Sequence, residues 1–333
     1  MIRRIEQNIA EITGFFILTC VFYLVAVNER WTFNSIILPE SLLAFNMIFL
    51  SILIEALPFV LIGVFIAGII QVFVTEDHIK KLIPENKFLA VGMSCILGAL
   101  FPACECGIVP IVRKLVYKGV PIFAGVGFLL TGPLINPIVI ASTYMAFGQD
   151  LRIALLRMGL GLLIAVVIAT VISLLFKGNQ LKQSDSLREL DQSSKRFPFL
   201  LRVKAMFIHS VDEFFDVAKY LILGAMLAAL VQTYVSTSTV IGLGEGIVLS
   251  TAVMMALAYL LSLCSEADAF IGASFRHVFP EASILGFLIY GPMLDLKNTI
   301  MMLAVFKFRF VLVLMVVITF SVFGILLFLH PWL

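Results

Sequence analysis

Two stretches of the sequence decide the fold: EALPFVLIGVFIAGIIQVFV (residues 55–74) and DVAKYLILGAMLAALVQTYV (residues 216–235). When they are aligned, acid matches acid, glycine matches glycine and glutamine matches glutamine, always 161 positions apart. Each stretch holds 20 mostly apolar residues, the length that a helix needs to cross the hydrocarbon core of a bilayer. We therefore expect each stretch to form a membrane-spanning helix.

Two further matches follow in the same order along the chain. Cys104 lies 160 positions before Cys264, and GFLLTGPLIN (residues 127–136) lies 159 positions before GFLIYGPMLD (residues 286–295). The separation between matched blocks drifts by only two positions over their whole length. Three matched blocks that keep their order in this way predict an internal duplication.

A polar linker separates the two predicted repeats. It covers residues 177–203 and contains GNQLKQSDSLRELDQSSKRF. Short loops that are rich in Lys and Arg stay in the cytoplasm, so we expect a cytoplasmic linker. The predicted parts of the chain are an additional N-terminal transmembrane segment (1–41), a first repeat (42–176), the linker (177–203) and a second repeat (204–333).

The composition indicates a membrane protein. Hydrophobic residues make up 61% of the chain and charged residues 13%, against roughly 45–50% and about 25% in soluble proteins. The apolar stretches predict about nine crossings, within a range of about 8–10. We predict an all-α, polytopic transmembrane helical bundle with two duplicated halves and interrupted helices. The expected partner is the lipid bilayer. A net charge of +2 does not indicate a nucleic-acid partner.

Four apolar stretches are interrupted at corresponding places in the two halves. The interruptions are FPACECG (101–107), TGPLINP (131–137), LCSEADA (263–269) and YGPMLDLKN (290–298). Proline lacks a backbone donor, and glycine permits conformations that other residues avoid. The backbone groups that such breaks release must be covered by protein or water. Paired breaks are typical of secondary transporters, whose substrate site lies near the midplane between repeats. A simple kink is the alternative.

Carboxyl groups at these breaks are candidates for proton transfer. A carboxylate at the bilayer centre costs about 2.5–3.5 kcal/mol, so it normally faces a cavity or a partner. We expect Glu105, Glu266 and Asp268 to exchange protons for the substrate. The alternative is a structural ion pair with Arg113, Lys114 or Arg276. The predicted substrate-binding residues are Cys104, Glu105, Cys106, Thr131, Asn136, Cys264, Ser265, Glu266, Asp268 and Asp295.

The cysteines at the breaks allow three interpretations. Thiolates bind soft metals and metalloids, so Cys104, Cys106 and Cys264 are candidate ligands for a soft atom or a metal if the two halves face each other. A redox pair is the second interpretation, although the Cys-x-Cys spacing matches neither a thioredoxin motif nor a structural zinc site. Small buried hydrophobic residues are the third.

Two acids have a lysine close by in the sequence. Lys297 follows Asp295 by two positions, and Lys219 follows Asp216 by three. Since residues three apart on a helix are neighbours, Asp216 is expected to pair with Lys219. A structural Asp295–Lys297 pair is the alternative to a binding role for Asp295.

Motifs of common enzymes are missing from the sequence. It has no Walker loop that ends in Lys-Ser/Thr and no His-Glu-x-x-His pattern. We therefore expect no cofactor and no enzymatic activity.

Five stretches, spread over both halves, are specific as a set. They are FPACECGIVPIVRKLVYKGVP (101–121), LLTGPLINPIVI (129–140), EFFDVAKYLILGAMLAALVQTYV (213–235), LCSEADAFI (263–271) and GPMLDLKN (291–298). Together they resemble the predicted bacterial permeases that include the organoarsenical efflux permeases. The resemblance implies an inner-membrane permease with a duplicated helical core, and it leaves the substrate open.

These observations predict a permease that exports a small thiol-reactive solute, such as a trivalent organoarsenical, through a midplane site between the repeats. A divalent metal transporter of the zinc type is the alternative within transport. A membrane thiol oxidoreductase is the alternative from another class. The expected partners are thus a small-molecule, metal or metalloid substrate, and a partner membrane subunit is left open.

Overall fold

The computed structural model describes residues 40–74, 84, 86–101, 104–176, 178, 180–182, 199–234 and 246–332. The chain divides into units of residues 1–44 and 45–333, and the features below belong to the second unit. The described residues form helices joined by short connections, with one isolated β-bridge between Leu181 and Phe306. The predicted all-α bundle is confirmed. Most of the predicted N-terminal transmembrane segment (1–41) and most of the linker lie outside the described residues.

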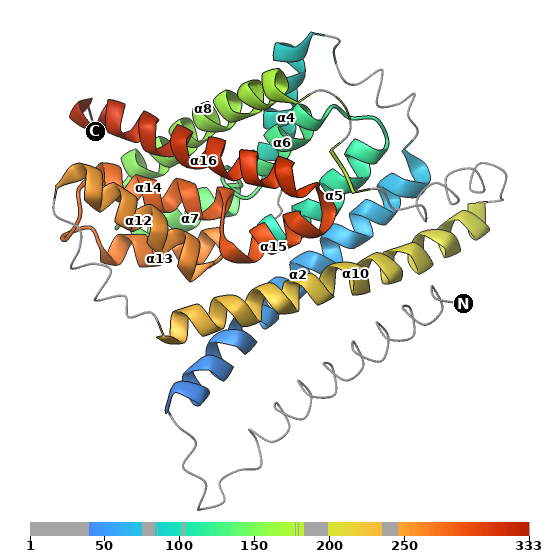
Figure 1. Ribbon diagram of the computed structural model, residues 1–333, viewed down its shortest axis with the longest axis horizontal. Coiled ribbons are helices and arrows are strands. Elements are labelled where there is room, and N and C mark those ends of the chain that lie inside the picture. The colour runs from blue at the N-terminus through green and yellow to red at the C-terminus, as the bar shows by residue number, and fades with distance from the viewer. Residues whose placement is uncertain are drawn as a thin grey trace, which may run out of the picture. The chain divides into compact units, whose positions relative to one another are not determined.

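Four helices of the described ranges are long and apolar enough to cross a membrane. They are α2 (Glu40–Phe73), α8 (Leu151–Leu175), α10 (Phe199–Tyr234) and α16 (Phe308–Leu329). α2 and α10 contain the two stretches that begin the predicted repeats. They cross each other (Figure 1), and the Phe65 and Phe207 rings lie 5.6 Å apart at the crossing.

Each interrupted stretch forms two short helices in series, as the sequence predicts. The pairs are α4 (Lys87–Ala99) with α5 (Glu105–Tyr117), α6 (Ile122–Thr131) with α7 (Pro137–Ala146), α12 (Ile247–Leu261) with α13 (Ser265–Ser274), and α14 (Glu281–Met293) with α15 (Leu296–Val305). With 10 to 15 residues each, these helices are shorter than the roughly 20 residues of a complete crossing. The breaks therefore place helix ends inside the bundle.

The short helices pack in corresponding pairs on the two sides of the linker. α4 packs against α6 and α6 against α8, while α12 packs against α14 and α14 against α16. The short helices that follow the breaks pack across: α5 contacts α15, and α7 contacts α13. α8 and α16, which contact each other, bury Ile164, Ile168, Leu314 and Ile318 completely. The core therefore lies between segments that are far apart in the sequence (Figure 1).

Glycines allow α2 to approach α5 closely. A Cβ atom on Gly63 would lie 2.7 Å from Cα of Gly107, and one on Gly107 would lie 2.7 Å from the carbonyl oxygen of Phe59. Such distances leave no room for a side chain, and small residues are the usual means by which helices in membranes come this close. This crossing holds the N-terminal half of α5 against α2.

We predict that Gly63→Ala lowers the free energy of unfolding by about 1–3 kcal/mol, because an added methyl group overpacks the crossing. Thermal unfolding of the purified protein in detergent measures the effect. Gly324→Ala in α16 is the matched control, since a Cβ there meets no atom within 4 Å. Equal unfolding temperatures for the two variants would contradict the close packing of α2 on α5.

Candidate functional site

Lys297 lies at the centre of a buried charged cluster. Its Nζ is 3.3 Å from Oε1 of Glu105 and 3.6 Å from Oδ2 of Asp295. Lys297 is 4% exposed, and Glu105 and Asp295 are each 1% exposed. The Asp295–Lys297 pair that the sequence suggests is therefore present, and Glu105 joins it from α5, 192 positions earlier in the chain.

The end of α12 holds Lys297 in place. Ser262, which follows α12, has a left-handed backbone conformation with a φ of 50°. Its Oγ accepts a hydrogen bond from the Lys297 backbone N at 3.0 Å, and its carbonyl oxygen accepts one from Lys297 Nζ at 3.3 Å. Non-glycine residues in this conformation are uncommon and gather at functional sites. The break after α12 thus positions the Lys297 ammonium group that pairs with Glu105.

Helix starts bring the acids and thiols together. Asp295 caps α15, because its Oδ1 accepts a hydrogen bond from Asn298 N at 2.5 Å. Cys104 and Cys264 are the residues at the N-caps of α5 and α13. A helix N-terminus favours negative charge, so three helix starts favour the acids and thiolates that the breaks carry.

The thiols lie in two places around the cluster. The side chains of Cys104 and Cys106 interact with each other, and the charge of Lys297 acts on both. Cys264 Sγ accepts a hydrogen bond from Ala267 N at 3.3 Å, and its thiol also interacts with Glu55 of α2. Among the residues that the structure describes, no three His, Cys, Asp or Glu side chains form a group that could hold a metal ion.

Arg157 is a second buried cation, which the sequence analysis missed. It is 1% exposed and comes from the N-terminal third of α8. Its NH1 donates to Oγ1 of Thr143 at 2.7 Å, and its NH2 donates to the carbonyl oxygen of Ser265 at 3.0 Å. Asp268 and the half-buried Glu266, both in the first turn of α13, act on it electrostatically. An arginine inside the apolar stretch 153–176 was the available signal, because such residues in membrane spans are usually functional.

The cluster has more free hydrogen-bond acceptors than donors. In the described part of the chain, both carboxylate oxygens of Asp268 lack a hydrogen-bond partner, as do Glu105 Oε2, Asp295 Oδ2 and Asn298 Oδ1. The nitrogen without a partner is Nε of Arg157. A buried acceptor without a donor costs about 1–3 kcal/mol. The arrangement therefore suits protons or a solute that donates hydrogen bonds.

The alternative role of these acids, a structural ion pair with Arg113, Lys114 or Arg276, is wrong. Arg113 and Lys114 both pair with Glu213 of α10, at 2.8 and 2.7 Å. Arg276 pairs with Asp150 at 2.9 Å. These cations lie at helix ends, beyond the breaks, where they meet acids from neighbouring helices. The acids at the breaks face the two cations described above instead.

Two predicted site residues have local hydrogen bonds. Thr131 Oγ1 donates to the Gly127 carbonyl oxygen at 2.9 Å, and Asn136 Oδ1 accepts from Ile138 N at 2.9 Å as the cap of α7. Both are buried. Their part in substrate binding stays a prediction.

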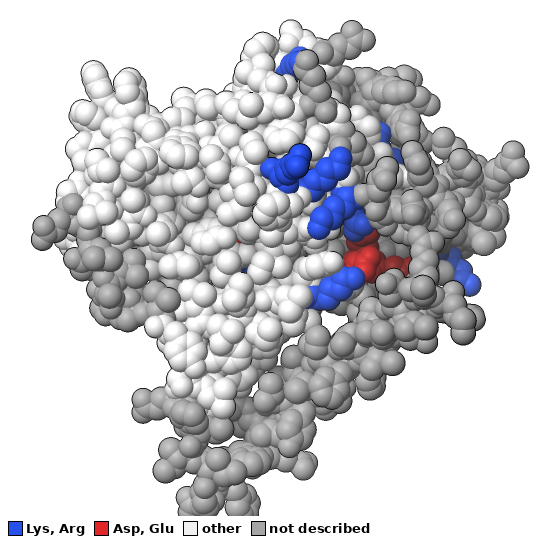
Figure 2. Space-filling model, in the orientation of Figure 1, with Lys and Arg blue, Asp and Glu red and all other residues white. Residues whose placement is uncertain are grey.

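The exposed Lys219–Asp216 pair is confirmed, with an Nζ–Oδ1 distance of 2.7 Å. Figure 2 shows Lys, Arg, Asp and Glu gathered in one area of the visible face, while most of the described surface is uncharged. Large apolar side chains are exposed over the helices, including Ile54, Leu174 and Phe320. Exposed apolar surface of this extent is typical of contact with lipid.

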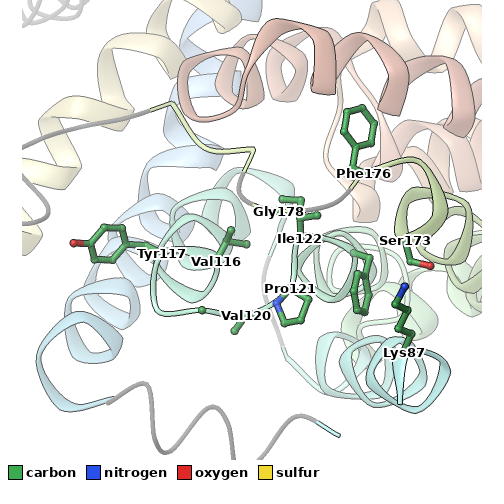
Figure 3. A pocket seen from close by; sticks show the side chains of 11 residues that line it. Lys87, Val116, Tyr117, Val120, Pro121, Ile122, Ser173, Phe176 and Gly178 are labelled. Carbon is green, nitrogen blue, oxygen red and sulfur yellow. The ribbon is translucent and has the colours of Figure 1, made fainter. Parts of the chain in front are cut away.

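A separate pocket lies away from the cluster. It has a volume of about 500 Å³ and is formed by α4, α5, α6 and the end of α8 (Figure 3). Lys87, Ile122, Ser173 and Phe176 are among its lining residues, and none of the residues of the charged cluster lines it. The candidate site is therefore the buried cluster, and not this pocket.

Comparison with known proteins identifies the family. Residues 41–329 match the family model described as "Predicted permease". The chain belongs to this predicted permease family. It is 51% identical over 275 residues to the UPF0718 protein YcgR of Bacillus subtilis (strain 168). The aligned residues cover 83% of this chain and 93% of that protein. No solved structure matches.

A second relative is named "Putative two-component membrane permease complex subunit" and comes from Streptococcus mutans serotype c. It is 41% identical over 275 residues, which cover 83% of this chain and 91% of that protein. The family and its members indicate a membrane permease, a transporter rather than an enzyme. The buried cluster of this permease is therefore the place to look for its substrate.

We predict that Lys297→Gln lowers the free energy of unfolding by roughly 3–5 kcal/mol, because it leaves buried carboxylates without their cation. Thermal unfolding and the amount of protein in the membrane measure this. The double variant Lys297→Gln with Glu105→Gln should recover part of the loss.

Lys219→Gln is the matched control for this prediction, because its pair with Asp216 is exposed to solvent. Removing an exposed pair changes stability by about 1 kcal/mol or less. Equal effects of the two lysine substitutions would contradict the central role of Lys297.

Proposed function

We propose that the chain exports a small thiol-reactive solute, such as a trivalent organoarsenical, through the buried cluster in exchange for protons. The observation that carries the proposal is the position of two buried thiols, Cys104 and Cys106, on either side of Glu105 at a break between helices, where Glu105 pairs with Lys297. Soft atoms bind thiolates, and a break inside a bundle is where transporters of this build bind their substrates.

Cys104 and Cys106 bind the soft atom in this scheme. Each arsenic–sulfur bond that forms replaces a bond from arsenic to a hydroxide, and the thiol proton leaves with that hydroxide as water. Oε2 of Glu105 has no hydrogen-bond partner among the described residues, so it can pass the proton from a thiol to the leaving hydroxide. Cys264, at the start of α13, completes the transfer to the other side of the cluster.

The acids supply the coupling to the proton gradient. Glu105, Glu266 and Asp268 come from two different breaks and act on one another or on a shared cation. A proton that enters from one side of the membrane neutralises a carboxylate and weakens its hold on Lys297 or Arg157. Proton entry and solute release are thereby linked, without a nucleotide.

The arrangement of the chain in the membrane is part of the proposal. We place the linker 177–203 in the cytoplasm and the chain in the inner membrane, with residues 42–176 and 204–333 as two repeats. The corresponding contacts of α4, α6 and α8 and of α12, α14 and α16 support the repeats. The name of the Streptococcus mutans relative supports a second membrane subunit.

Two other functions use the same residues. A divalent metal such as zinc is the alternative cargo, because thiolates and carboxylates bind it as well. A membrane thiol oxidoreductase would cycle Cys104 and Cys106 between the thiol and the disulfide form. The oxidoreductase requires a disulfide during turnover, and the permease does not.

We predict that Cys104→Ser and Cys106→Ser each reduce transport of a trivalent methylarsenical into everted membrane vesicles by at least about tenfold, because a hydroxyl is a poor ligand for a soft atom. The amount of protein in the membrane should stay unchanged. Cys95→Ala is the control, since Cys95 packs with Val91 and Ala169 away from the cluster. Full transport by the double serine variant would exclude the thiol ligands.

We predict that Glu105→Gln and Glu266→Gln keep solute exchange between equal concentrations but lose acceleration by a proton gradient. Glutamine keeps the size of the side chain and cannot titrate. Uptake into everted vesicles, with and without an imposed pH difference, measures both activities. Glu281→Gln, which changes an acid outside the cluster that pairs with the exposed Arg152, should respond to the gradient as the unchanged protein does. An unaltered response of both Glu105→Gln and Glu266→Gln would exclude their coupling role.

A further inference from the structure

Arg157 and Asp268 are buried opposite charges that do not hydrogen-bond to each other. Each is 1% exposed. Asp268 exerts the largest attraction on Arg157, and Arg157 exerts the largest attraction on Asp268. Yet both carboxylate oxygens of Asp268 and Nε of Arg157 lack a hydrogen-bond partner among the described residues. A buried charge pair is normally satisfied by direct hydrogen bonds, so this arrangement requires an explanation.

The guanidinium group of Arg157 is instead bonded to two other helices. It donates to Thr143 Oγ1 of α7 and to the carbonyl oxygen of Ser265, the first residue of α13. Arg157 itself belongs to α8, so its side chain ties α7, α8 and the start of α13 together. Cys264, the cap of α13, directly precedes the residue that is held.

Asp268 lies on the same side of α13 as the carbonyl oxygen that binds the guanidinium. Residues three apart on a helix share a face, so Asp268 lies one turn beyond the carbonyl oxygen of Ser265 on the side that faces Arg157. α14 leaves space for the carboxylate, because a Cβ on Gly291 would lie 2.6 Å from Asp268 Oδ2. The guanidinium thus has two acceptors on this side of α13: the Ser265 carbonyl oxygen, to which it is bonded, and the Asp268 carboxylate, which attracts it.

Other charges around Asp268 are of both signs. Glu105 of α5 and Asp295 at the start of α15 repel its carboxylate, while Lys297 of α15 attracts it. On α13 itself, Glu266 and Cys264 also act on Arg157. With two acids and one lysine around it, Asp268 depends on Arg157 as its main counter-charge.

We propose, on the basis of the proton-coupled transport proposed above, that Asp268 binds a transported proton and that Arg157 is the positioning residue that responds to it. With the proton on Asp268, the carboxyl group is neutral and Arg157 bonds to Thr143 and the Ser265 carbonyl, as in the structure. When the proton leaves, Arg157 turns to the carboxylate. The start of α13 then loses its tie to α7 and α8, and Cys264 is free to move with it.

Infrared difference spectroscopy of the full-length protein in lipid tests this with protons as the only probe. A change of pH should produce the C=O stretching band of a protonated carboxylic acid, and Asp268→Asn should remove one component of that band. Two substitutions should then change, in opposite directions, the proton concentration at which this component appears.

Arg157→Gln removes the counter-charge of the carboxylate, so the Asp268 band should persist to a proton concentration at least about tenfold lower. Thr143→Val removes a competing partner of Arg157 and favours the Arg157–Asp268 contact, so the band should disappear at a higher proton concentration. Thr170→Val is the matched control, because Thr170 bonds only to the Val166 carbonyl of its own helix, and it should shift nothing. Arg157→Lys, which keeps the charge, should change the proton concentration at which the band appears less than Arg157→Gln does.

If Arg157→Gln does not reach the membrane, the double variant Arg157→Gln with Asp268→Asn should restore the protein, since neither charge is then left alone. Two results would overturn the inference. In the first, Arg157→Gln and Arg157→Lys leave the proton concentration at which the Asp268 band appears unchanged. In the second, Thr143→Val changes this concentration in the same direction as Arg157→Gln does. In a further outcome, the Asp268 band responds to the substitutions as expected while transport into vesicles has the same rate with and without a proton gradient. This combination would uphold the Arg157–Asp268 pair and reject the proposed function.

Discussion

The contact between Lys297 and Glu105 is the interaction on which the rest of the structure depends. A charge inside a membrane protein is stable only when opposite charges and hydrogen bonds surround it. Lys297 obtains these from Glu105 of α5, from Asp295 before α15 and from Ser262 after α12. Those three residues stand at three different helix breaks on both sides of the linker. Satisfying one ammonium group therefore fixes how the broken helices meet.

The breaks in turn explain how an apolar bundle can carry polar chemistry. Helices that end inside the bundle leave backbone and side-chain groups that lipid cannot satisfy, and here these groups face one another. Arg157 connects α7, α8 and α13 through its hydrogen bonds, as Lys297 connects α5 and α15 through its ion pair. The two cations divide the acids between them, and several carboxylate oxygens in the described part of the chain still lack donors. A site with spare acceptors is suited to gain and lose protons as its helices move.

The permease function rests on this chemistry and on the family. The exposed surface of the helices is apolar, whereas the acids, the thiols and both buried cations are gathered where the helices are interrupted. Membership of the predicted permease family agrees with a path for a solute through this region. The large pocket near Lys87, by contrast, contains none of these groups. The interior of the bundle, and not its surface, is therefore where solute specificity is to be sought.

The sequence by itself determined the fold class, the four helix breaks and most of the acids and thiols of the site, because apolar length, proline, glycine and the cost of a charge in lipid act locally. It also indicated the Asp295–Lys297 and Asp216–Lys219 pairs, whose partners are close in the chain. Only the tertiary structure decided that Glu105 meets Lys297, that Glu213 takes Arg113 and Lys114, and that Arg157 belongs to the site. These partners lie on helices that are far apart in the sequence. Which charges meet depends on helix packing, and local sequence patterns do not contain that information.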